Sequence, residues 1–238
     1  MNSFYSKVKR NICATLTSKS GTLLMAVALI LQVPASAQTT GLTFTDHTLH
    51  SGTAGANGAV YRFANAAPGI DVLVEIKSRS GSNVVLKDID LTTCGLNTSF
   101  QPQLERSGNV VGIDEWWMEF EFRFVKAGTQ LDANLQKLAI TALDVDGDGL
   151  TVEEYVEFYK AKSCSLASPS NIQAIPLNGN NETGTGDKNY RFEGELPRTA
   201  GIDIVNTAIM GYAKYENMNR IKVRIGGESL GLGIATET

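Results

Sequence analysis

The chain has 238 residues, of which 42% are hydrophobic and 19% are charged, and its formal net charge at pH 7 is −4. This apolar content is ordinary for a chain that buries a core. An acidic protein is poorly suited to bind nucleic acid or an anionic membrane surface, whereas it favours cations.

The N-terminal segment 1–37 has the order of a secretory signal peptide. It contains no acidic residue, its four basic residues precede an apolar run at 23–31, and Ala35-Ser36-Ala37 supplies the small residues of a cleavage site. The run is about half of the ~20 residues that span a bilayer, so an anchor is the weaker alternative, and no later segment predicts a transmembrane span. We therefore expect an exported protein, extracellular or on the outer cell surface, that begins near Gln38. Without residues 1–37 the chain has 17 basic and 25 acidic residues, a net charge of −8.

Residues 38–58 are rich in Thr, Gly and Ala, and we expect a flexible lead-in there. The only two histidines, His47 and His50, fall in this segment. A surface-loop position explains them better than a catalytic or zinc-binding role. The remaining residues, 59–238, are expected to form a single β domain of a size that one large domain can have.

Strand-like segments follow one another from residue 59, with Gly and Asn turns between them. The clearest is 116–125, because apolar and polar residues alternate along it. Its predicted core face carries Trp116, Met118, Phe120, Phe122 and Phe124. Further strands are predicted at 70–77, 83–87, 138–143, 155–160, 202–210 and 220–225. Helix signals are weak, with one short turn at 131–137. This pattern predicts an all-β fold, a two-layer antiparallel β-sandwich of jelly-roll or immunoglobulin-like type.

One segment carries a pattern typical of a metal site. Asp144, Asp146 and Asp148 alternate with other residues, and glycines follow the second and third carboxylates. Calcium takes six to eight oxygen ligands, and glycine permits the sharp turn that brings them together. Three close carboxylates also repel one another unless a cation neutralises them. We therefore expect one Ca²⁺ here rather than a plain acidic turn, which is the alternative for a segment rich in turn residues.

The predicted calcium loop resembles the first half of an EF-hand loop and the aspartate-rich repeats of thrombospondin type. It departs from an EF-hand in its second half, where Tyr155 takes the place of the bidentate glutamate and strands flank the loop. The expected shell is completed by a backbone carbonyl near Leu150 and by Glu153 or Glu154.

No pattern of catalytic residues stands out, so we expect a protein that is not an enzyme. No Gly-x-Ser-x-Gly motif surrounds a serine, and Glu119 and Glu121 lie on one strand face instead of across a cleft. Trp117 is predicted on the polar face of its strand, where an exposed indole can stack on a sugar ring. The alternative is that a loop covers this tryptophan, since tryptophan is usually well buried.

Two cysteines, Cys94 and Cys164, remain after export, and an oxidising compartment allows them to pair. The disulfide would close a loop of about 70 residues, for which loop entropy gives on the order of 4 kcal/mol. Two unpaired thiols are the equal alternative.

Several short motifs resemble a module of secreted, adhesin-like surface proteins of Bacteroidetes that use type IX secretion. They are Tyr61-Arg62-Phe63-Ala64-Asn65, Gly69-Ile70-Asp71, Ser99-Phe100-Gln101-Pro102, Phe124-Val125-Lys126-Ala127-Gly128-Thr129, residues 139–147 and residues 154–158. The resemblance spans about residues 59–225 and implies a secreted or surface location and a modular architecture more than a chemistry. We expect an unidentified protein or glycan ligand, with other surface modules as further partners. The chain departs from these proteins because no sorting domain follows before Thr238. A carbohydrate-binding module is the alternative function, and a hydrolase with an unidentified site is the third.

Overall fold

The computed structural model describes residues 25–26, 28–35, 38–93, 95–108, 112–147, 152–177, 188–194 and 203–230. Within these ranges the chain is almost entirely β, and every strand pairs antiparallel with its neighbours. The exception is one short 3₁₀ helix, η1 (Thr207–Ile209). None of the described residues lies in a helix that is both long and apolar enough to span a membrane. The expected all-β sandwich is confirmed.

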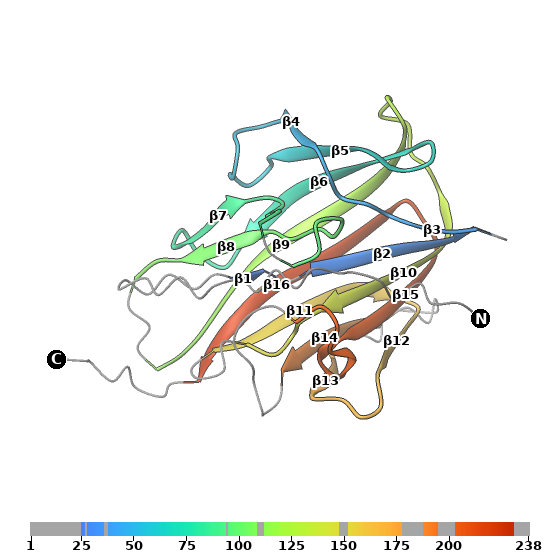
Figure 1. Cartoon of the computed structure of the whole chain (residues 1–238). Coiled ribbons are helices and arrows are strands. Elements are labelled where there is room, and N and C mark those ends of the chain that lie inside the picture. The colour runs from blue at the N-terminus through green and yellow to red at the C-terminus, as the bar shows by residue number, and fades with distance from the viewer. Residues whose placement is uncertain are drawn as a thin grey trace.

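The larger layer is an eight-stranded sheet, counted over the described residues. Its spatial order is β13 (Ile172–Pro176), β14 (Lys188–Gly194), β11 (Val152–Ala161), β16 (Arg220–Leu230), β9 (Ile113–Lys126), β6 (Ile70–Arg79), β5 (Val60–Ala67) and β4 (His47–Ser51). Figure 1 shows the long strands β6, β9 and β16 lying side by side through the middle of the molecule.

The second layer is divided into two smaller sheets. One has the order β12 (Ser163–Leu166), β15 (Gly211–Met218), β10 (Leu135–Leu143), β2 (Ala28–Ala35) and β3 (Gln38–Gly41). The other has the order β1 (Met25–Ala26), β8 (Gln103–Arg106) and β7 (Val84–Asp88). In Figure 1 these strands cross one face of the large sheet. The opposite face of that sheet carries mostly charged side chains.

The core lies between the layers and is centred on phenylalanines. The alternation predicted for 116–125 is confirmed, because the five apolar side chains of that face are buried in β9. Phe100 lies at the centre of an aromatic cluster, with ring centroids 4.9 Å from Phe122 and 5.4 Å from Phe120. Edge-to-face pairs of this kind add stability beyond the area that the rings bury.

The hydrophobic core includes residues that precede 59, the position at which the domain was expected to start. Leu42 and Phe44 are core residues, and the Phe44 ring lies 5.1 Å from that of Phe63. His47 begins β4, the edge strand of the large sheet. The composition of 38–58, rich in Thr and Gly, did not predict this packing, because within the described residues the segment contacts the core through two large apolar side chains, Leu42 and Phe44.

The strand predicted at 202–210 was wrong. Its described part, 203–210, forms a turn followed by η1. Asp203 accepts a hydrogen bond from the Val205 N–H at 3.0 Å, and Asn206 accepts one from the Ala208 N–H at 3.1 Å. Such side-chain acceptors compete with the backbone pairing of a sheet and favour turns, despite the apolar residues between them.

Candidate functional site

The aspartate-rich segment forms the connection between β10 and β11, and its first two aspartates are buried. Asp144 is 3% exposed and Asp146 is 1% exposed. Asp144 has a backbone φ of +60°, a region that Asp and Asn enter more readily than other non-glycine residues. The segment lies directly against the end of β14, since a Cβ added to Gly194 would stand 2.6 Å from the Asp146 carbonyl oxygen. The backbone thus holds both carboxylates inside the protein.

A third acidic residue, Asp203, lies beside this pair. Its backbone N–H donates to Asp144 Oδ1 at 2.9 Å. Burial raises the pKa of Asp144 to about 7, although the hydrogen bond from Asp203 opposes the shift, and the charges of Asp146 and Asp203 raise the pKa further. The region is therefore an environment in which a carboxylate resists ionisation unless a cation is present.

The other predicted calcium ligands are only partly placed. Asp148 and Leu150 lie outside the described residues. Glu153 and Glu154 are neighbours in β11, so their side chains lie on opposite faces of the sheet, and Glu154 is the buried one. At most one of the two can contribute to one metal shell. Among the described residues, no three His, Cys, Asp or Glu side chains are grouped closely enough to hold a metal ion.

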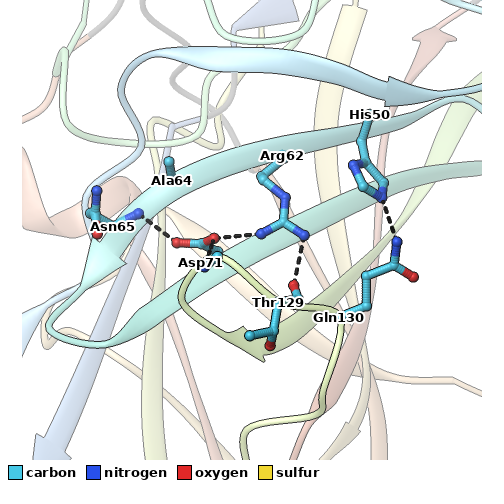
Figure 2. A pocket seen from close by; sticks show the side chains of 8 residues that line it. His50, Arg62, Ala64, Asn65, Asp71, Thr129 and Gln130 are labelled. Carbon is cyan, nitrogen blue, oxygen red and sulfur yellow. Dashed lines mark hydrogen bonds and ion pairs between the residues drawn. The ribbon is translucent and has the colours of Figure 1, made fainter.

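Figure 2 shows a second polar cluster, in which Asp71 is the central residue. The Asp71 carboxylate accepts hydrogen bonds from the Asn65 N–H at 2.8 Å, from the Gly128 N–H at 2.9 Å and from Arg62 at 2.5 Å. Arg62 also donates to the Thr129 carbonyl oxygen at 2.7 Å. This cluster ties the β5–β6 hairpin to the turn that follows β9.

The Asp71 cluster is best explained as a structural tie. Burial raises the pKa of Asp71, but the donors from Asn65, Gly128 and Arg62 outweigh burial, so the pKa lies below its ordinary value and the group stays ionised. Asn65 and Gly128 both have positive φ, at +52° and +71°, which turns their N–H groups toward the carboxylate. Three of the six motifs quoted for the family resemblance, 61–65, 69–71 and 124–129, thus meet in this cluster.

A shallow hollow of about 720 Å³ opens above the Asp71 cluster. His50 and Gln130 face one another across it, with 3.2 Å between their side-chain nitrogens (Figure 2). His47 instead packs against the rings of Tyr61 and Phe63. His50 is thus paired with an amide side chain and His47 with aromatic rings.

The outer face of the large sheet carries a row of alternating charges across four strands. Arg191, Glu157, Arg224 and Glu119 follow one another in register from β14 to β9. Glu157 lies 2.6 Å from Arg191 and 3.3 Å from Arg224, and Arg224 lies 3.2 Å from Glu119. Opposite charges directly across neighbouring strands stabilise their pairing and register.

Trp117 lies beside this row and is half-buried. The Arg224 guanidinium lies 3.9 Å from the centre of its indole ring, within the range of a cation–π contact. One face of the ring is therefore already in contact with an arginine. A sugar has only the remaining face on which to stack.

Cys164, on β12, is a free thiol in the structure, and burial raises its pKa, with smaller opposing effects from Tyr190 and Lys188. Cys94 lies outside the described residues. The disulfide between them stays a prediction.

Comparison of the chain with protein-family models, with curated proteins and with solved structures returned no match.

Proposed function

We propose that the mature chain is a secreted or cell-surface β-sandwich module of adhesin type, without enzymatic activity, in which the loop at 144–148 is stabilised by Ca²⁺. The observation that carries the calcium assignment is the burial of Asp144 and Asp146 side by side, with Asp203 as a third acidic neighbour. Burial disfavours the ionised form of a carboxylate, as the raised pKa of Asp144 indicates, and a hard cation with oxygen ligands favours that form.

The donor set fits calcium in kind. Carboxylate oxygens are the preferred ligands of this ion, and the two buried aspartates supply them from a loop whose turn is made possible by Gly147, with φ of +106°. Because the loop lacks the terminal glutamate of an EF-hand, we expect the weak affinity of extracellular modules, a Kd of ~10⁻⁴ to 10⁻³ M.

Calcium binding is tested by thermal unfolding of the secreted protein in millimolar CaCl₂ and in excess chelator. A ligand that binds only the folded state at 100 times its Kd stabilises it by about 2.7 kcal/mol, so chelation lowers the melting temperature while the sandwich stays folded. Asp146→Asn is expected to abolish the difference. Asp46→Asn is the control, because it removes a carboxylate of the same kind from an exposed position outside the loop. A melting curve that calcium does not move in the wild-type protein contradicts the assignment.

The adhesin-type role is supported by the predicted signal peptide and by the resemblance to adhesin-like surface proteins. A binding experiment can distinguish a protein ligand from a glycan ligand. The carbohydrate-binding alternative depends on Trp117, and the contact with Arg224 weakens it. Glycan-array binding by the wild-type protein that Trp117→Ala removes would favour a carbohydrate-binding module instead.

A further inference from the structure

One N-terminal segment joins the two halves of the second layer. β1 pairs with β8 in one small sheet, and β2 pairs with β10 in the other. A single residue separates β1 from β2, so the segment 25–35 bridges the two sheets. Figure 1 shows β2 lying along β10, and within their sheet β2 lies between β10 and β3.

The same segment lies inside the predicted signal peptide. If export removes residues 1–37, β10 loses its partner along the edge from Ala139 to Leu143, where the register pairs it with residues 28–32. β3, which pairs with β2, loses its partner as well. The exported protein then presents a row of unpaired backbone N–H and C=O groups, which is a template for another strand.

The edge of β10 that loses its partner contains residues of the hydrophobic core. Ile140 and Ala142 of β10 are fully buried core residues, and their register partners on β2 are Leu31 and Leu29. Leu104 of β8, which pairs with β1, is also a core residue. Loss of the bridging segment therefore leaves one core strand of each small sheet without its partner, and water is a poor substitute for the missing strand.

We propose that the exported chain is a strand acceptor, in which the edge of β10 binds an extended segment of another exported protein. The segment that occupies the edge in the whole chain defines the chemistry of this partner. Residues 28–35, with the sequence Ala-Leu-Ile-Leu-Gln-Val-Pro-Ala, carry no charge and place Leu29, Leu31 and Val33 at alternate positions. The partner strand runs antiparallel to β10, with backbone hydrogen bonds that supply affinity and alternate apolar side chains that supply specificity. This inference rests on the export part of the proposed function.

The test uses the protein purified after secretion from cells that express the full chain, with its N-terminus sequenced. The probe is a fluorescent peptide of residues 28–35 with lysines added at both ends for solubility. Its control carries Leu31→Pro, because proline has no N–H to donate and position 31 lies within the register that pairs β2 with β10, unlike Pro34. We expect saturable binding, at least tenfold weaker for the control peptide. At 100 times its Kd the probe raises the melting temperature by about 5 to 10 °C.

The full 238-residue chain produced in the cytoplasm keeps β2 and is expected not to bind the probe. A secreted protein that begins near Gln38 but does not bind the probe, or binds both peptides equally, overturns the strand-acceptor proposal alone. Dimers of the secreted protein that the probe does not disperse also overturn it, because a second copy then closes the edge. A secreted protein that retains residues 25–35 contradicts the export proposal, and the acceptor with it.

Discussion

The substitution Asp144→Asn separates the cost of a buried charge from the benefit of calcium. Asparagine keeps an oxygen that can accept the Asp203 N–H, and it tolerates the positive φ of this position. It cannot ionise. The variant therefore removes the charge of residue 144 with little change in shape.

The magnitude follows from the pKa of Asp144, which burial raises from 3.8 to about 7 in the folded protein. One pKa unit corresponds to 1.36 kcal/mol, so the shift amounts to on the order of 4 kcal/mol of folding free energy. The folded state holds the proton more tightly than the unfolded state does. The stabilisation is therefore complete below pH 3.8 and is lost as the pH rises from about 4 to 7.

The assay is urea unfolding at pH 4.5 and pH 8, with excess chelator and with 5 mM CaCl₂. In chelator at pH 8 we expect Asp144→Asn to be more stable than the wild-type protein, by up to the amount given above. Calcium is expected to restore the stability of the wild-type protein at pH 8 and to leave the variant unchanged.

Asp90 requires a control, because burial raises its pKa to about 7 as well, with the Gln101 N–H opposing the shift. The comparison is therefore repeated in an Asp90→Asn background, and the contribution of residue 144 is taken as the difference between Asp144→Asn and its parent, because burial also raises the pKa of Glu193. If Asp144→Asn destabilises the protein at pH 8 in chelator, the reasoning from buried charge is refuted. If calcium stabilises the variant as much as the wild-type protein, residue 144 is not a ligand.

Two further substitutions test the sheet and the Asp71 cluster. Gly226→Ala places a Cβ 2.5 Å from the Tyr155 ring and 2.6 Å from the Trp116 carbonyl oxygen, so we expect a loss of about 1 to 3 kcal/mol, and an unchanged urea midpoint would contradict the packing described. Asp71→Asn removes the charge that holds Arg62 and is expected to cost about 1.5 to 3 kcal/mol at pH 7. Because the pKa of Asp71 is lowered, its stabilisation is present above pH 3.8 and is lost as the pH falls below that value, so the difference between variant and wild type should shrink at pH 2.5.

Alternation of apolar and polar residues was sufficient to predict the central strands, because a half-buried strand requires it at every second residue. It identified β9 and placed Trp117 on the outer face, as the structure does. It could not predict β4, whose residues are all exposed, or the short strands β12 and β13. These strands lie at or near sheet edges, where backbone pairing rather than burial of side chains holds them.

The candidate site was harder to predict than the fold, because its residues come from distant parts of the chain. Asp203 donates to Asp144 across 59 positions, and no local spacing reports such a contact. The Asp71 cluster is a similar case, since Gly128 lies 57 positions from the carboxylate that it contacts. A short sequence repeat does mark two of these aspartates, because Gly69-Ile70-Asp71 and Gly201-Ile202-Asp203 share the order Gly-Ile-Asp. In both places the aspartate carboxylate accepts a hydrogen bond from a nearby backbone N–H, that of Asn65 for Asp71 and that of Val205 for Asp203.

The two tryptophans of the chain are neighbours in β9 and lie on opposite faces of the large sheet. Trp116 is buried in the core, whereas Trp117 is half-exposed beneath the guanidinium of Arg224. Intrinsic fluorescence of this protein is therefore the sum of an interior and a surface signal that originate one residue apart. Iodide distinguishes them, since it reaches only the surface indole of the folded protein. A ligand that binds the outer face changes the quenchable fraction, while one that inserts between the layers changes the fraction that iodide does not reach.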